Sequence, residues 1–147
     1  MYSTKVSYED FNGEKKEETL YFYMNKPEML KLLKERPEFM DTLSSIADRL
    51  GKKNTDGDPT LYIDFMSVID ELFRMSYGIK TVDGKFKKKP DILEDFLSSN
   101  AYDALFTKFM DNPDEFNVFT RGIFPADVMT DEVIAEATRK AEAMKEE

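Results

Sequence analysis

The sequence predicts an α+β fold, mainly α, in which an N-terminal β-hairpin packs on a bundle of five to seven short helices around a central buried helix. Residues 2–24 alternate apolar and polar side chains on both sides of an Asn12-Gly13 turn signal, as a hairpin does. Residues 61–77 repeat apolar side chains at the spacing of a helix. Elsewhere, proline and glycine residues divide the chain into further short segments with helical spacing.

Composition limits the class of protein. The chain has 147 residues, 41% hydrophobic and 35% charged, with a net charge of −9. This length suits one core, so we expect a single compact domain over residues 1–126 and a helical tail over 127–147, which docks loosely. Short apolar runs argue against a membrane span, and the acidity argues against a nucleic acid partner. The first ten residues lack the features of a signal peptide, which predicts a cytoplasmic protein.

The sequence contains no cysteine and no histidine. Thiol nucleophiles, the usual zinc sites and the commonest general base near neutral pH are therefore excluded. Adjacent acids such as Asp70-Glu71 and Glu94-Asp95 point about 100° apart on a helix, so they do not converge on one metal ion or one scissile bond. We predict that the protein is not an enzyme and uses no metal or cofactor.

Two registers compete for the hairpin of residues 2–24. A two-residue Asn12-Gly13 loop would put the apolar sets of the two strands on opposite faces. A three-residue loop that ends in a left-handed Gly13 instead pairs Tyr2 with Phe22, so the sets share one face. We predict the second register. It leaves Tyr21 and Tyr23 on the far face of the hairpin.

Two helices are expected between the hairpin and residue 61. Asn25 is a cap, Pro27 suits a first turn, and Glu28 completes a capping box, so a helix is predicted at about 26–35. Pro37 disfavours helix at the preceding residue and separates a second helix at 38–50. The polar loop 52–59 lacks the glycine and glutamate positions of an EF-hand, so we interpret it as a turn and not a calcium site.

Residues 61–77 supply the helix about which the other elements are expected to pack. One apolar face consists of Tyr62, Phe65, Met66, Ile69, Leu72 and Phe73. A second apolar stripe consists of Leu61, Val68 and Met75. A helix that is apolar over so much of its circumference is typical of the interior of a domain. We therefore predict that this helix is buried.

The remaining segments are a short hairpin, three helices and the tail. Asp83-Gly84 predicts a turn between extended pieces at 79–82 and 85–88, and the lysines that follow are interpreted as a solvated loop and not a phosphate site. Helices are expected to start at Pro90, after a cap at Ser98 or Ser99, and at Pro113 with Asn112 as its cap. The tail helix from Thr130 has only a thin apolar stripe, formed by Val133, Ala137, Ala141 and Met144.

Short motifs in the second half of the chain follow one another in a specific order. They are Ser76-Tyr77-Gly78-Ile79-Lys80, Asp83-Gly84-Lys85 with Phe86 and Lys88, Phe96, Ala101-Tyr102, Leu105-Phe106, Asp111, Phe119, and Gly122-Ile123 with Pro125. In this order the chain resembles the tail assembly chaperones of long-tailed, siphovirus-type bacteriophages. The hairpin end 19–22 and the helix start 26–28 are similar too, so the likeness covers most of residues 2–125. The basic run 86–89 departs from the pattern.

The resemblance implies a role that is not enzymatic. Members of this family bind the long, largely helical tape measure protein and keep it soluble while tail tube subunits polymerise around it, and they leave before the virion is complete. It implies the tape measure protein as partner, with tail tube protein and a second copy of the chain as further candidates. It also implies action in the host cytoplasm, absence from the mature virion, and in many members a longer, frameshifted form. Eight motif residues are expected to be mainly structural: Tyr77, Gly78, Asp83, Gly84, Tyr102, Phe106, Gly122 and Pro125.

A chaperone of an apolar helix needs exposed apolar surface, an unpaired strand edge or a loose amphipathic helix. The candidates in this sequence are Tyr21 and Tyr23, the outer edge of the hairpin, and the tail residues Val133, Ala137 and Met144. The alternative is that the tyrosines pack on a neighbouring helix and the tail is inert. A second hypothesis for function is a permanent structural component of the tail or of the head–tail joint.

Overall fold

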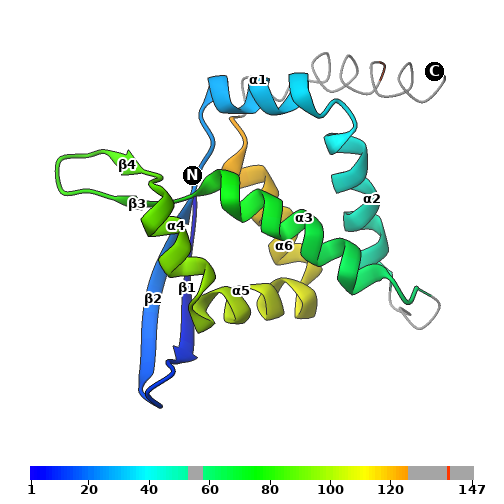
Figure 1. Ribbon diagram of the computed structural model, residues 1–147. Coiled ribbons are helices and arrows are strands. Elements are labelled where there is room, and N and C mark those ends of the chain that lie inside the picture. The colour runs from blue at the N-terminus through cyan, green and yellow to red at the C-terminus, as the bar shows by residue number, and fades with distance from the viewer. Residues whose placement is uncertain (53–57, 126–138, 140–147) are drawn as a thin grey trace.

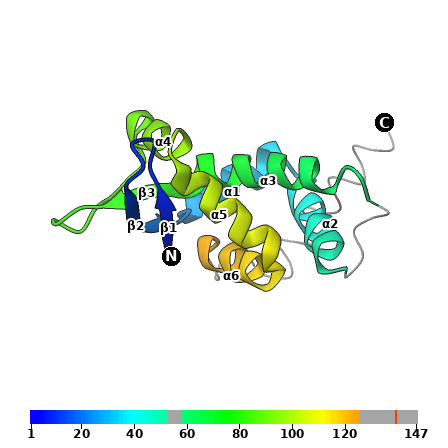
Figure 2. The same cartoon turned by 90° about the horizontal axis from the view of Figure 1, so that it is seen from below.

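The computed structural model describes residues 1–52, 58–125 and Arg139. Within these residues the fold is α+β and mainly α, as predicted, with one four-stranded sheet and six helices. The elements are β1 (Tyr2–Glu9), β2 (Lys15–Phe22), α1 (Lys26–Glu35), α2 (Phe39–Gly51), α3 (Leu61–Ser76), β3 (Tyr77–Lys80), β4 (Phe86–Lys87), α4 (Pro90–Leu97), α5 (Asn100–Asp111) and α6 (Pro113–Ile123). Helix α3 runs through the middle of the molecule, and the β3–β4 hairpin projects from its side (Figures 1 and 2).

The first hairpin has the predicted register. Tyr2 pairs with Phe22 and Thr4 with Leu20, and Gly13 ends a three-residue loop with a φ of +82°. The same count recurs in the second hairpin, where Gly84 has a φ of +84° and Lys80 pairs with Phe86. In both loops a positive φ is required at the last position, which glycine adopts without a steric penalty.

Helix α1 begins and ends at the predicted residues. Asn25 and Glu28 form a complete capping box, in which each side chain accepts a hydrogen bond of 3.0 Å from the backbone N–H of the other. After Pro37, helix α2 begins at Phe39, one residue later than expected. Asn112 is the N-cap residue of α6, as predicted, but its side chain makes no capping hydrogen bond. The same residue is the C-cap of α5, where its backbone N–H donates to the carbonyl of Lys108.

The prediction for the central helix is partly wrong. Helix α3 ends at Ser76 and not at Tyr77, because Tyr77 pairs with Phe22 and starts β3. Its buried arc is Leu61, Phe65, Val68, Ile69, Leu72, Phe73 and Ser76. Tyr62 and Met66, which were assigned to the buried face, are exposed to 50% and 45%. The sheet and the helices cover one arc of α3, so apolar side chains on the flank of its first turns remain in contact with solvent.

Aromatic rings from five of the described elements meet in the core. The ring of Phe22 lies 5.1 Å from that of Phe73, 5.3 Å from Phe119, 5.5 Å from Tyr77 and 5.9 Å from Phe96, centroid to centroid. These contacts join β2 to α3, β3, α4 and α6. Tilted and edge-on rings at such distances contribute about 0.5–1.5 kcal/mol per pair beyond the burial of their surface.

Candidate partner-binding surfaces

Tyr21 and Tyr23 lie on the outer face of the sheet, as their register predicts, but the face is not free. The ring of Tyr23 lies edge-on to that of Phe86, with 6.4 Å between centroids. The ammonium of Lys80 lies 4.9 Å from the centre of the Tyr21 ring. The β3–β4 hairpin, and not a helix, therefore covers part of both tyrosines, and both are half-buried. The tail residues Val133, Ala137 and Met144 lie outside the described residues.

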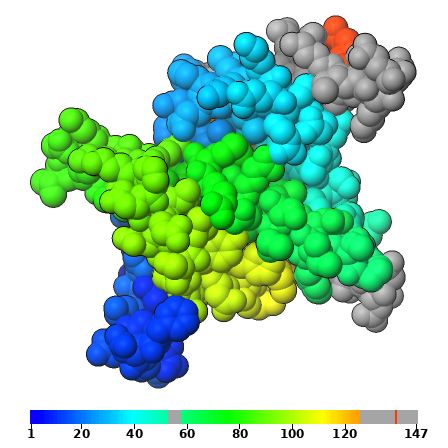
Figure 3. Space-filling model, viewed as in Figure 1, coloured from blue at the N-terminus to red at the C-terminus, as the bar shows by residue number. Residues whose placement is uncertain are grey.

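An exposed apolar surface occurs instead on the first turns of α3. Tyr62, Ile63 and Met66 are exposed to 50%, 64% and 45%. Residues three and four apart on a helix are neighbours, so Met66 lies beside both Ile63 and Tyr62, and the three side chains form one surface, here named the α3 ridge. Figure 3 shows α3 (green) at the molecular surface between the α1–α2 segment and α5. Next to the ridge, Phe65 packs on Phe106 of α5, with 5.3 Å between ring centroids.

Reasoning from the sequence missed the α3 ridge because Tyr62 and Met66 fit the apolar period of the helix. Period shows which side chains share a face of the helix, but it does not show how wide an arc the neighbouring elements cover. A signal was present in the chain, since the apolar residues of 61–77 exceed what one buried face can hold.

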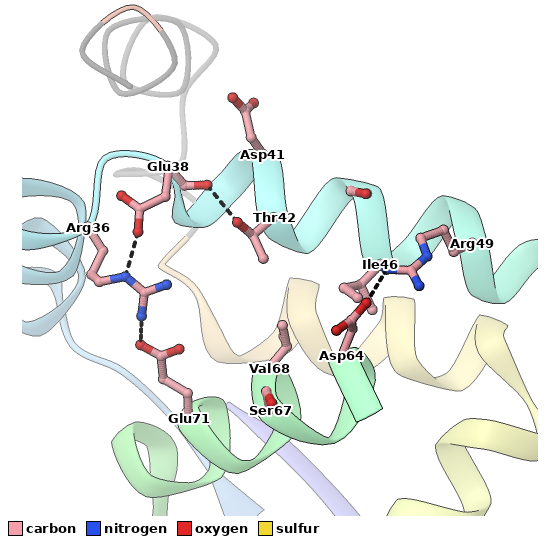
Figure 4. Close-up of a pocket in the computed structure, with 11 residues that line it drawn as sticks. Arg36, Glu38, Asp41, Thr42, Ile46, Arg49, Asp64, Ser67, Val68 and Glu71 are labelled. Atoms are coloured by element: carbon pink, nitrogen blue, oxygen red, sulfur yellow. Dashed lines mark hydrogen bonds and ion pairs between the residues drawn. The ribbon is translucent and has the colours of Figure 1, made fainter. Parts of the chain in front are cut away.

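A groove of about 480 Å³ lies on the other flank of α3, between α2 and α3. Ile46 and Val68 contribute apolar surface to it (Figure 4). Small hydroxyl side chains, those of Thr42, Ser45 and Ser67, line the groove beside them. We name this feature the α2–α3 groove.

An arginine bridges each end of the α2–α3 groove. At one end Arg36 donates from Nε to Glu38 at 2.6 Å and from Nη1 to Glu71 (Figure 4). The hydrogen bonds that Arg36 donates to the two carboxylates raise its pKa, the bond to Glu38 more than the bond to Glu71. This end therefore carries a permanent cation that its own chain neutralises.

At the other end, Arg49 binds Asp58 through two nitrogens at 2.6 Å and Asp64 through Nη1 at 2.8 Å. The hydrogen bonds that Arg49 donates to Asp58 and, to a smaller extent, to Asp64 raise the pKa of Arg49, and the bond from Arg49 lowers the pKa of Asp58. Both arginines are thus directed at carboxylates of this chain and are not presented as anion-binding groups.

The family of the chain follows from a comparison with known proteins. A family model described as phage tail assembly chaperone matches residues 1–147. The chain belongs to this family. No curated protein and no solved structure matches it.

The residues that carried the resemblance have clear places in this tail assembly chaperone. Tyr77 stacks on Phe96, with 4.3 Å between ring centroids, and burial raises its pKa to about 12. A Cβ on Gly78 would lie 2.7 Å from the carbonyl oxygen of Lys87 and 2.8 Å from the Phe86 ring, so a side chain does not fit. Asp83 accepts a hydrogen bond from Thr81 in the turn that Gly84 closes.

The motif residues nearer the end of the chaperone are also in contact with its core. The hydroxyl of Tyr102 donates to Asp70 at 3.2 Å, and burial, followed by Asp70, raises its pKa to about 12. A Cβ on Gly122 would lie 2.9 Å from the Cβ of Tyr2, which explains the glycine where α6 crosses β1. Pro125 is buried.

Two kinds of feature do not occur in the described part of the chaperone. In residues 1–52, 58–125 and 139, no group of three or more His, Cys, Asp or Glu could hold a metal ion. No helix among those residues is both long and apolar enough to span a membrane. The surfaces described above are suited to contact with other polypeptides.

Proposed function

We propose that this tail assembly chaperone binds the tape measure protein and keeps it soluble in the host cytoplasm while the tail tube polymerises. It acts by binding alone, and it leaves before the virion is complete. The observation that supports this proposal most directly is the α3 ridge, where three large apolar side chains are between 45% and 64% exposed on an otherwise acidic protein. An exposed apolar surface of this kind is typical of a protein interaction site.

The size of the α3 ridge suits a contact that must be reversible. Full burial of one large apolar side chain contributes about 1.5–3 kcal/mol, and the ridge residues are already partly buried. Each therefore adds on the order of 1 kcal/mol on binding. Many weak contacts along one long partner hold it in solution, yet each chaperone dissociates readily when tube subunits compete for the same surface.

The net charge of −9 supports the same role. Copies that crowd along one apolar partner repel one another and the other acidic proteins around them, which opposes precipitation of the complex.

The proposal is tested by coexpression with the tape measure protein encoded in the same genome. The wild-type chain should raise the soluble fraction of the tape measure protein and co-purify with it. Ile63→Asp should reduce both, because a carboxylate in the contact must be desolvated without a partner. Val118→Asp is the matched control, since Val118 is exposed to 51% on α6, away from the ridge.

Two outcomes would count against the proposal. If the wild-type chain neither solubilises nor co-purifies with the tape measure protein, the partner is wrong. If mass spectrometry finds the chain in purified virions at the level of structural proteins, it is a permanent component of the tail or of the head–tail joint and does not leave.

A further inference from the structure

We propose that the α2–α3 groove binds a helix of the protein partner, and that this helix carries basic side chains about seven residues apart on either side of apolar ones. The inference rests on the proposed function, because the helix belongs to the same partner as the one that covers the α3 ridge. Ser67 in the groove is four residues from Ile63 in the ridge, so the two surfaces adjoin along α3.

The inner surface of the groove suits an apolar side chain. Ile46 and Val68 are 3% and 6% exposed, so they belong to the core and offer only a small apolar surface at the base of the groove. The hydroxyls of Thr42 and Ser67 each donate at 3.2 Å to a backbone carbonyl of their own helix. Their hydrogen bonds are therefore already made, and burying them beneath a partner leaves no unpaired donor.

The groove exists because small side chains face one another across it. Thr42 and Ser45 on α2 and Ser67 on α3 stand where larger residues would fill the space between the helices. Two helices that lie side by side with small residues between them form a trough, and a third helix fits such a trough by ridges-into-grooves packing.

The two arginine bridges mark the two ends of the α2–α3 groove and so define its length. Their carboxylates on α3 are Asp64 and Glu71, which are seven residues apart and therefore about 10 Å apart along the helix. This is the rise of two helical turns. A partner helix with basic residues at i and i+7 presents them to the two ends, with residues i+3 and i+4 facing Ile46 and Val68.

The charge of the lining determines which helix fits. Four carboxylates line the groove, those of Glu38, Asp41, Asp64 and Glu71, against two guanidinium groups, so its net charge is −2. Glu71 and Asp64 each have oxygen lone pairs beyond those that the arginine uses. An acidic groove on an acidic chain attracts lysine or arginine and repels phosphate.

A series of substitutions at Ser45 tests the inference without breaking any bridge. Ser45 is exposed, lines the groove and belongs to a helix in which glutamate, arginine and alanine are all good helix formers. The probes are synthetic peptides of about 20 residues, about 30 Å long as helices, that together cover the tape measure protein. Binding of each peptide to the full chain is measured by fluorescence anisotropy.

The expected result is an order of affinities set by charge. Ser45→Arg should weaken the binding of the tightest-binding peptide about tenfold, and Ser45→Glu should strengthen its binding severalfold. Ser45→Ala should leave its affinity unchanged. The same three substitutions at Ser44 are the matched control, because Ser44 is exposed on α2 but does not line the groove. They should have no effect.

A charge swap in the peptide separates recognition from structural damage. Replacing the two basic residues of the best peptide by glutamate should reverse the order, so that Ser45→Arg binds it more tightly than the wild type does. A merely destabilised variant would bind both peptides less well.

The inference is overturned if Ser45→Arg binds every peptide as the wild type does, or if the bound peptides lack paired basic residues. If Ile63→Asp abolishes binding but the three Ser45 variants bind the peptides with the affinity of the wild type, the groove inference fails and the proposed function stands. Absence of binding by the wild type, to the peptides and to the intact tape measure protein, overturns both.

Discussion

The two ends of α3 have similarly apolar sequences but very different surroundings. At the C-terminal end, the ring of Phe73 lies within 6.3 Å, centroid to centroid, of the rings of Phe22, Phe96, Tyr102, Phe109 and Phe119. At the N-terminal end Leu61 and Phe65 are buried too, but Tyr62, Ile63 and Met66 face solvent. The difference teaches that an apolar helix can stabilise the fold along its whole length and still offer a binding surface at one end, because burial depends on the neighbours that reach each side chain.

The last turn of α3 is also stabilised by a hydrogen bond from a residue outside the helix. The ammonium of Lys88 donates to the carbonyl of Met75 at 2.9 Å and to the carboxylate of Glu28 at 2.8 Å. A lysine at this place satisfies a terminal carbonyl and complements the negative end of the helix dipole. The basic run 86–89, which was interpreted as a solvated loop, is therefore structural at Lys88.

The largest effect is expected at the buried end. Phe73→Ala removes a fully buried ring with five aromatic neighbours, so it should lower the free energy of unfolding by about 3–5 kcal/mol. Urea denaturation followed by circular dichroism measures the change. A loss below about 1 kcal/mol would mean that the two ends of α3 do not differ in the way described.

A smaller effect is expected where β3 leaves the buried end. Gly78→Ala places a Cβ against the carbonyl of Lys87, which is part of the β4 backbone and cannot easily shift. This substitution should lower the free energy of unfolding by about 1–3 kcal/mol. Gly51→Ala is the control, because no atom lies within 4 Å of its added Cβ and alanine favours the end of α2. Equal thermal midpoints for the two variants would contradict the close approach of β3 to β4.

The smallest effect on stability is expected at the exposed end. Ile63→Asp should change the free energy of unfolding by no more than about 0.5 kcal/mol, because Ile63 is 64% exposed. The same denaturation experiment checks it. A loss similar to that of Phe73→Ala would show that the α3 ridge is part of the core, and the reduced partner binding expected of this variant would then follow from unfolding.

Local rules predicted most of the elements because they depend on few residues. The hairpin register followed from one glycine that needs a positive φ and from the requirement that both apolar sets share a face. The bounds of α1 followed from Asn25, Glu28 and Pro37. The position of the cap at Asn112 also followed from the sequence, but the lack of a capping bond from its side chain did not, because α5 ends and α6 begins at this one residue.

The candidate binding surfaces depended on contacts between distant segments. The β3–β4 hairpin covers part of Tyr21 and Tyr23 because α3 ends at Ser76 and the chain continues as a strand from Tyr77. The apolar periodicity of residues 61–77 instead predicted that the helix includes Tyr77. The α2–α3 groove joins residues up to 35 positions apart, as Arg36 and Glu71 show. Neither could be found from the spacing of residues along the chain.

The sequence by itself determined the class of fold, the hairpin register, the starts of most helices and the resemblance to tail assembly chaperones, because each rests on neighbouring residues or on motifs in order. Only the tertiary structure decided which of the apolar residues of 61–77 are core and which form the α3 ridge. The physical reason is that periodicity gives each side chain a direction from its own helix, while burial requires another element to lie in that direction.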